Sequence, residues 1–163
     1  MIRILLVFSV IATAVHAATV WYLPRFAMDT AMSRLEAAGG ETNSWLHVPP
    51  TDETSRRVVR PSPDLLYSVC LLDVSEGPVR VQAADWGDFT SLSLFASNTD
   101  NIFARNDRQT SGDIEIVVAD GADGEVDLGG QTGIALIRRL APDADRIAAA
   151  DAVRRARDVC EPV

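Results

Sequence analysis

Lysine is missing from this 163-residue sequence, and cysteine and histidine, the usual zinc ligands and catalytic bases, occur only twice each. The sequence has no Gly-x-Ser-x-Gly motif and no glycine-rich loop of the kind that cradles phosphate. These absences speak against a zinc centre, a serine hydrolase and a nucleotide-binding protein. We therefore expect no cofactor and favour no catalytic mechanism.

Positive charge is also scarce. All 15 basic residues are arginine, and they face 23 Asp and Glu residues, so the formal net charge is -8. The first 25 residues contain Arg3 and Arg25 but no acid, and without them 13 arginines remain against 23 acids, a net charge of -10. A domain this acidic repels nucleic acid, which is therefore not an expected partner. The missing lysine, together with 22 alanines, is interpreted as codon bias.

One long apolar run opens the chain. Residues 4–23 carry no formal charge, and twenty helical residues at about 1.5 Å each span about 30 Å, the thickness of the hydrocarbon core of a membrane. Trp21 and Tyr22 stand where an interfacial aromatic belt lies. Residues 1–24 therefore form a transmembrane anchor or a signal segment.

The alternative to an anchor is a cleaved signal peptide, because Val15 and Ala17 are small residues before a plausible cleavage point at Ala18. The length of the run, which continues past that point to Leu23, favours the retained anchor. Both alternatives export the rest of the chain.

Residues 25–56 are expected to form a helical stalk followed by a loop. Phe26, Met28, Met32 and Leu35 lie near one face of a helix over residues 25–38, which is either a stalk that continues the anchor or a helix lying on the domain. Two glycines at 39 and 40 end it. Residues 41–55 are predicted to be a loop with one apolar plug at 45–47.

The densest structural signal lies between residues 60 and 83. Residues 65–74 are apolar except for Ser68 and Asp73, which predicts a central strand buried on both faces. Residues 79–83 alternate apolar and polar side chains as a half-buried strand does, and the turn residues Glu76, Gly77 and Pro78 separate the two runs. We predict a β-hairpin or a close relative of one.

The remaining pattern predicts one mainly β (α+β) domain over residues 57–163. Further strands are expected at residues 90–95, 102–104, 113–119 and 131–140, with turns at 120–130 and a helix at 143–160. Short strands joined by Gly- and Asp-rich turns predict an antiparallel β-sandwich or a partly closed barrel, with an N-terminal transmembrane helix and a C-terminal helix.

Polar residues suggest one binding hypothesis. Amide and carboxylate groups cluster in the NTDN segment at 98–101 and again at 106–107, and they suit a polar ligand such as a sugar; the same residue types also form Asx-turns and caps. The candidate binding residues are Asp64, Tyr67, Asn98, Asp100, Asn101, Asn106 and Asp107.

Two charged sets have a functional and a structural interpretation. The acidic set is Asp120, Asp123, Glu125 and Asp127, and the basic set is Arg60, Arg105, Arg108, Arg138 and Arg139. The acidic set has the oxygen density of a calcium loop without its spacing, so an acidic turn is preferred. The basic set could bind a carboxylate, but the many acids favour ordinary ion pairs.

Cys70 and Cys160 are the only thiols. In an exported, oxidising setting an even pair suggests a disulfide; two buried free thiols are the alternative. Two alkylatable thiols in the unreduced protein would exclude the bond.

Three separated motifs resemble a known family: RPSPDLLYS at 60–68, LDVSEGPV at 72–79 and NTDNIFARND at 98–107. In this order they are similar to the family catalogued as domain of unknown function 1254, in particular its short bacterial members that begin with an apolar segment. Longer members have an Asn-Arg-Asp-Thr-like approach to the tyrosine, where this chain has SPDL at 62–65.

The resemblance covers roughly residues 43–160. It implies a largely β, envelope-exported domain without a settled activity, held at the bacterial inner membrane by residues 4–23 and facing the periplasm. Longer members are often joined to a domain of the companion family catalogued as unknown function 1214, so a protein of that family is an expected partner. The chain is then an accessory, partner-binding module; the alternative is an envelope enzyme or binding protein for a polar small molecule.

Overall fold

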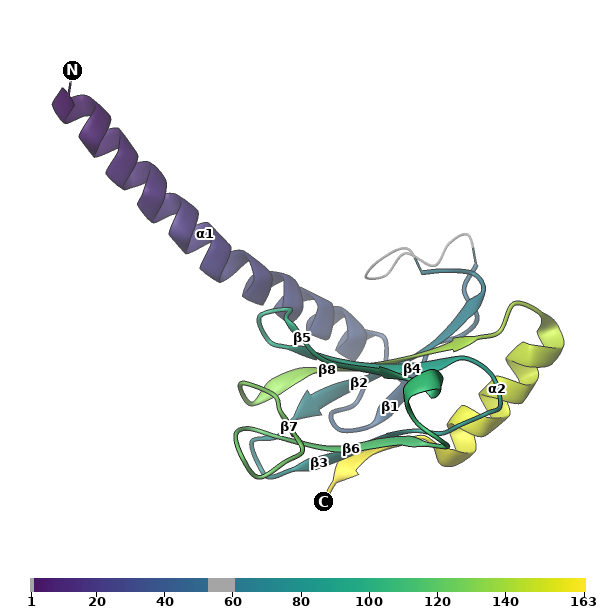
Figure 1. The fold of residues 1–163 in the computed structure, drawn as a ribbon. Helices are drawn as coiled ribbons and strands as arrows, with labels where there is room; N and C mark the ends of the chain where they lie inside the picture. The colour runs from purple at the N-terminus through teal and green to yellow at the C-terminus, as the bar shows by residue number, and fades with distance from the viewer. Residues whose placement is uncertain (1, 53–60) are drawn as a thin grey trace.

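The computed structural model describes residues 2–52 and 61–163. It consists of two β-sheets packed face to face, with a long helix at the N-terminus and a shorter one near the C-terminus (Figure 1). The first sheet has the strand order β1-β2-β8-β4-β5 and the second β7-β6-β3-β9. The elements are α1 (Ile2–Ala37), β1 (Trp45–His47), β2 (Leu65–Asp73), β3 (Val79–Ala83), β4 (Thr90–Ala96), β5 (Asn101–Asn106), the 3-10 turn η1 (Asp107–Gln109), β6 (Ile114–Ala119), β7 (Val126–Asp127), β8 (Thr132–Leu140), α2 (Ala144–Arg157) and β9 (Val159–Pro162). The predicted sandwich with one helix at each end is confirmed.

Strand β2 occupies the interior position that its sequence predicts. It pairs with β8 along its whole length, from Leu65 opposite Leu140 to Asp73 opposite Thr132, and with the short β1 on its other side. Its central residues are buried on both faces because the second sheet covers one face and α1 covers part of the other.

The predicted hairpin of β2 and β3 is wrong. The two strands belong to different sheets: β3 pairs with β6 and β9, and β2 with β1 and β8. The chain turns at Gly77, whose φ of +143° suits glycine, and crosses from one sheet to the other. Leu72 and Val81 belong to the same core cluster, so the two strands bury their apolar sides in the core between the sheets instead of pairing edge to edge.

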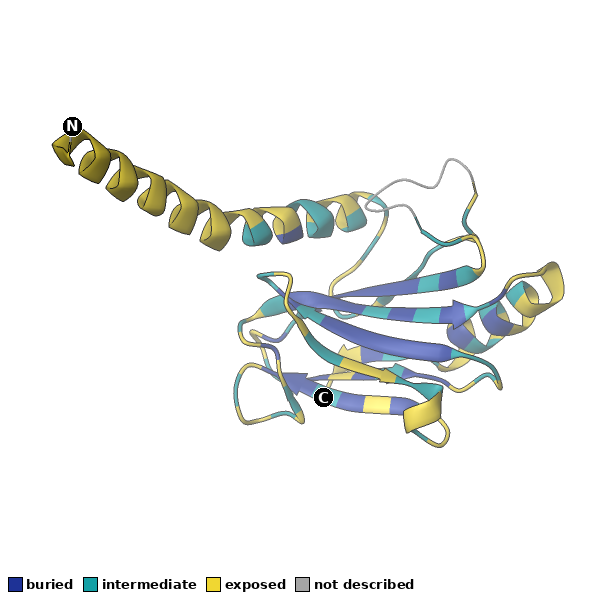
Figure 2. Ribbon diagram, turned by 45° about the horizontal axis from the view of Figure 1, so that its top comes forward, coloured by how far each residue is buried: buried dark blue, intermediate teal, exposed yellow. Residues whose placement is uncertain are grey.

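The main core lies between the sheets (Figure 2). Leucines of β2 and β4 meet valines and isoleucines of β3 and β6 there. Cys70 on β2 and Cys160 on β9 form the suggested disulfide, which ties the last strand of the second sheet to the first sheet. No free cysteine remains.

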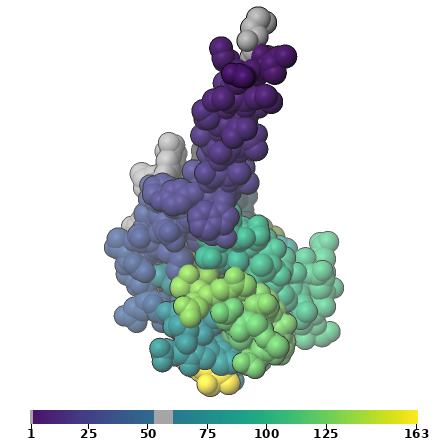
Figure 3. All heavy atoms as spheres, turned by 90° about the vertical axis from the view of Figure 1, so that its left-hand side faces the viewer, coloured from purple at the N-terminus to yellow at the C-terminus, as the bar shows by residue number. Residues whose placement is uncertain are grey.

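Helix α1 joins the apolar run to the domain without a break (Figures 1 and 3). It is the single helix in the described chain that is long and apolar enough to cross a membrane, and its first part is exposed throughout. Met28, Met32 and Leu35, near its end, pack on the outer face of the first sheet against Val69 and Leu71. Of the two alternatives for residues 25–38, a stalk and a helix lying on the domain, both therefore hold for the same helix.

Three short strands lie where turns, loop or helix are predicted. Residues 45–47 form β1, so the first sheet begins before residue 57, and residues 126–127 form β7. The helix predicted over residues 143–160 ends at Arg157, and β9 follows it. Each of these strands extends a sheet at its edge. The partners of β1 and β9 lie far away in the sequence, whereas β7 pairs with β6, eight residues earlier.

Candidate binding groove on the outer face of the first sheet

The outer face of the first sheet has a covered end and an open end. The end of α1 covers the part formed by Val69, Leu71 and Ile134. Further along the strands, four residues lie in register across the sheet: Tyr67 of β2, Arg138 of β8, Ser91 of β4 and Asn106 of β5. Directly opposite side chains of neighbouring strands point to the same side, so this row faces outward together.

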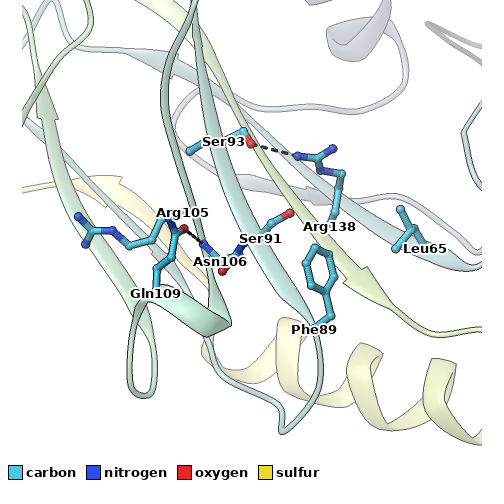
Figure 4. Close-up of a pocket in the computed structure, with 9 residues that line it drawn as sticks. Leu65, Phe89, Ser91, Ser93, Arg105, Asn106, Gln109 and Arg138 are labelled. Carbon is cyan, nitrogen blue, oxygen red and sulfur yellow. Dashed lines mark hydrogen bonds between the residues drawn. The ribbon is translucent and has the colours of Figure 1, made fainter.

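A groove of about 420 Å³ follows this row (Figure 4). This volume lies within the range of small-molecule sites. Its lining comprises Leu65, Phe89, Ser91, Ser93, Ala104, Arg105, Asn106, Gln109 and Arg138. The lining combines apolar walls with a few polar groups that converge from three strands and η1, the composition typical of a binding site.

Two buried polar atoms in the groove have no hydrogen-bond partner among the described residues: Oγ of Ser91 and Nε of Arg138. Ser91 is only 7% exposed. The guanidinium of Arg138 is held at its tip, where Nη2 donates to Oγ of Ser93 at 3.2 Å. Buried polar groups are nearly always paired, so two unpaired atoms on directly opposite residues need an explanation.

At the far wall, Asn106 and Gln109 hold η1 in place by a reciprocal cap. Oδ1 of Asn106 accepts from the backbone N–H of Arg108, and Oε1 of Gln109 accepts from the backbone N–H of Asn106. Both acceptor oxygens are thereby engaged, which leaves the two side-chain NH₂ groups available as donors.

The groove carries one positive charge. Arg138 points into it, and no acidic residue of the described chain lines it. Arg105 also lines the groove, but it is in register with the buried Leu92, so its guanidinium points away from the groove (Figure 4). Neither guanidinium forms a salt bridge with a carboxylate in the described chain, and that of Arg105 lies 5.1 Å from the ring centroid of Phe103. A positively charged groove is unusual in a chain of net charge -8, and its charge favours negatively charged ligands.

Two parts of the predicted binding set lie at opposite ends of β5. Asn98 and Asp100 form an Asx-type turn between β4 and β5, in which the Asn98 amide donates to the Asp100 carboxylate at 2.6 Å, and Asn101 begins β5. Asn106 and Asp107 lie at the other end of the strand, about 17 Å away at 3.4 Å per residue.

Asp64 and Tyr67 lie at the start of β2, three strands away from β5. The Tyr67 hydroxyl accepts from the backbone N–H of Ser62 at 2.9 Å, and Asp64 is exposed. The structure therefore does not bring the seven predicted residues into one pocket. Of the seven, Asn106 lines the groove, and Tyr67 lies at the end of the row of four residues that the groove follows.

Phe89, Ser91, Ser93 and Gln109 were not among the predicted site residues. The signal in the sequence was the TSLSLFA pattern of β4, in which serines alternate with leucines. That pattern predicts a strand with one polar face, and a polar outward face on an interior strand could have indicated a site.

The predicted arginine set is divided by the structure. Arg60 lies outside the described residues. Arg105 and Arg138 line the groove, whereas Arg139, the next residue of β8, points into the protein and pairs with Asp158. Only part of the set therefore follows the ion-pair interpretation.

The acidic turn has a structural role at Asp127. Its Oδ1 accepts from the backbone N–H groups of Gly121 and Gly129, and these hydrogen bonds lower the pKa of the Asp127 carboxyl. This use of the carboxylate agrees with the preferred interpretation as a turn.

A second polar cluster lies between β1, β2 and α2. Nδ1 of His47 and Oγ of Ser68 are 2.8 Å apart, and the nearby guanidinium of Arg154 binds the backbone oxygens of Tyr67 and Val48. Ser68 is 1% exposed, so its hydroxyl is closed to a substrate in spite of its histidine partner. The cluster joins α2 to β1 and β2, and its role is structural.

This cluster predicts a pH dependence of stability. Burial is the main cause that lowers the pKa of His47 below 6.5, and the positive charge of Arg154 lowers it further. The negative charge of Asp158 partly offsets this decrease in the pKa. The unfolded chain therefore binds the proton more tightly than the folded one. This contribution to stability is full above about pH 6.5, decreases as the pH falls from there toward the lower folded-state pKa, and levels off below that pKa. We expect His47→Gln to flatten the decline of the unfolding free energy just below about pH 6.5, as measured by urea unfolding at a series of pH values; an unchanged slope would contradict this origin.

Comparisons with known proteins agree with the resemblance seen in the sequence. The sequence model of the family described as Protein of unknown function (DUF1254) matches residues 42–159. A search of the curated proteins found no significant match. Among solved structures, the VPA0106 protein from Vibrio parahaemolyticus is similar, with a TM-score of 0.65 and 16% identity over 90% of this chain and 37% of that chain.

A putative uncharacterized protein from Burkholderia cenocepacia is also similar, with 18% identity and a TM-score of 0.47 over 72% of this chain and 36% of that one. This chain thus spans well under half the length of either solved chain. The likeness to the Vibrio protein shows a shared fold.

Proposed function

Because the chain belongs to the family described as Protein of unknown function (DUF1254), we propose that it is a membrane-anchored accessory module of the bacterial envelope that binds a partner protein. Helix α1 holds it in the inner membrane as a single span, and the sandwich faces the periplasm. The companion family of unknown function 1214 supplies the partner.

The observation that carries this proposal is the unbroken course of α1. Its first 22 residues, Ile2–Leu23, are exposed and almost wholly apolar, which is costly in water but favourable in a bilayer. The same helix reaches Met28, buried against the first sheet. An anchor that continues into the domain positions that domain close to the membrane.

Two further features support export and a partner. The disulfide between Cys70 and Cys160 is of a kind that persists in oxidising compartments such as the periplasm. The shared fold covers 37% of the Vibrio chain, so in that protein it is joined to further sequence. A companion protein bound to this chain is the corresponding arrangement that we propose here.

The anchor is tested by membrane extraction and by topology. We expect the full chain to resist carbonate extraction, to keep its N-terminus in the mature protein, and to give activity with a periplasmic reporter fused after Val163 but not with a cytoplasmic one. Introducing arginine at Ile11 and Val15 should release the chain from the membrane. A mature N-terminus at Ala18 would instead establish a cleaved signal.

The partner is tested by co-expression with a protein of the companion family from the same genome. We expect the two to remain together through purification in a neutral maltoside and to give one peak in size-exclusion chromatography. Separate elution of two folded proteins would contradict the accessory role without affecting the anchor.

A further inference from the structure

We propose that the groove on the outer face of the first sheet binds a small organic carboxylate, with the anionic end between Arg138 and Ser91 and the apolar end against Phe89 and Leu65. This site is independent of the anchor and of the partner. It also differs from the predicted polar cluster, because of those seven residues only Asn106 lines the groove.

The first argument is the pair of unsatisfied atoms. Ser91 and Arg138 are directly opposite in the ladder between β4 and β8. Ser91 Oγ and Arg138 Nε are both buried, and neither has a partner in the described chain. A carboxylate has two acceptor oxygens at a fixed spacing, so one group can accept from a hydroxyl and from a guanidinium N–H at once.

The second argument is the position of the guanidinium. Ser93 holds its tip by the 3.2 Å hydrogen bond, and Figure 4 shows the Ser91 hydroxyl and the Arg138 side chain on the same side of the sheet. A guanidinium held in place loses less entropy on binding than a free one, and its planar fork matches carboxylate geometry.

The third argument is the balance of charge and donors. The groove contains the guanidinium of Arg138, two serine hydroxyls and two amides whose oxygens are already engaged, and no carboxylate of the described chain lines it. Because Arg138 supplies a single positive charge at the buried end, this end suits a monoanion better than a dianionic phosphate.

The fourth argument is the apolar wall. Leu65, Phe89 and Ala104 line the same groove, and Phe89 and Leu65 flank Arg138 in Figure 4. Such a wall offers nothing to an inorganic ion but gains free energy from the apolar body of an organic acid. The ligand class is therefore a carboxylate with a short hydrocarbon or aromatic body.

The test uses the full chain in neutral maltoside micelles with ¹⁵N-labelled arginine and follows the Nε–H signals at pH 7. We expect hexanoate to shift the Arg138 signal saturably, acetate to bind more weakly, and hexanamide and inorganic phosphate to have little effect. Dodecanoate, which enters the micelles, distinguishes a membrane-derived acid from a soluble one. If the natural ligand is membrane-derived, dodecanoate binds more tightly than hexanoate; if it is soluble, dodecanoate does not. Either result supports the site.

Two variants and one control test whether Ser91 and Arg138 bind the carboxylate. We expect Ser91→Ala to weaken hexanoate binding about tenfold, and Arg138→Gln to weaken it about a hundredfold, the loss typical of hydrogen bonds to a charged group. Arg80→Gln removes the same charge from the second sheet, where Arg80 pairs with Glu161, and should leave binding unchanged.

The proposal is overturned if all arginine signals shift in proportion to added hexanoate, if hexanamide or phosphate competes equally, or if Arg80→Gln weakens binding as much as Arg138→Gln. Ser91→Ala removes a single oxygen and is the milder change, so it decides the matter where Arg138→Gln unfolds. Unchanged hexanoate affinity in folded Ser91→Ala also contradicts the site.

Discussion

Replacing Cys70 and Cys160 together by alanine lowers the free energy of unfolding by about 4 to 5 kcal/mol in the chain-entropy account of disulfides. The bond closes a loop of 90 residues in sequence separation, which contains the strands β3 to β8 and begins and ends within β2 and β9. It also joins β2 of the first sheet to β9 at the edge of the second. Without it, β9 is held by its ladder with β3 and by the exposed ion pair of Glu161 with Arg80.

This loss is measured by urea unfolding, followed by tryptophan fluorescence, of the oxidised wild type, the reduced wild type and the double variant. The reduced wild type is the matched control, because it keeps both sulfur atoms in the core. We expect it to lose most of the stability that the variant loses. If the reduced and oxidised proteins unfold at the same urea concentration, the bond does not contribute to stability.

The parts of the fold that the sequence predicted are those with local signals. The apolar run of β2, the alternation in β4 and β6, and the Asp143 cap of α2 all depend on residues close together in the chain. The sandwich class followed from the number and spacing of such strands.

The parts that it did not predict depend on distant partners. The turn at residues 76–78 looks like a hairpin turn, but whether β2 and β3 pair edge to edge or face each other depends on β8, about 60 residues further on. The two- to four-residue strands β1, β7 and β9 carry too few residues for a periodic pattern, and their pairing decides their conformation.

The groove was hidden for the same reason. Its central row brings together residues 67, 91, 106 and 138, which are neighbours only in the register of four strands. Sequence reasoning instead grouped residues by type and proximity, which placed Asn98 and Asp100 in the site although they form a turn of their own.

Asp158→Ala should destabilise the protein by about 3 to 5 kcal/mol, the usual cost of removing one partner from a buried ion pair. The side chains of Arg139 and Asp158 are 1% and 0% exposed, and both oxygens of Asp158 accept from the guanidinium, at 2.6 and 2.8 Å. The carboxylate also accepts from the backbone N–H of Ala84, whose carbonyl oxygen accepts from Arg139. The variant thus leaves the buried charge of Arg139 and the backbone N–H of Ala84 without their partner.

The double variant Arg139→Met/Asp158→Leu separates the cost of stranding a charge from the net contribution of the pair. We expect it to recover much of the stability that Asp158→Ala loses, because apolar residues of similar volume often replace a buried pair without loss. Glu161→Ala, which breaks the exposed pair with Arg80, is the surface control and should leave the free energy of unfolding nearly unchanged. A double variant as unstable as Asp158→Ala would show instead that the ion pair itself, with its bonds to Ala84, holds the end of α2 against β8.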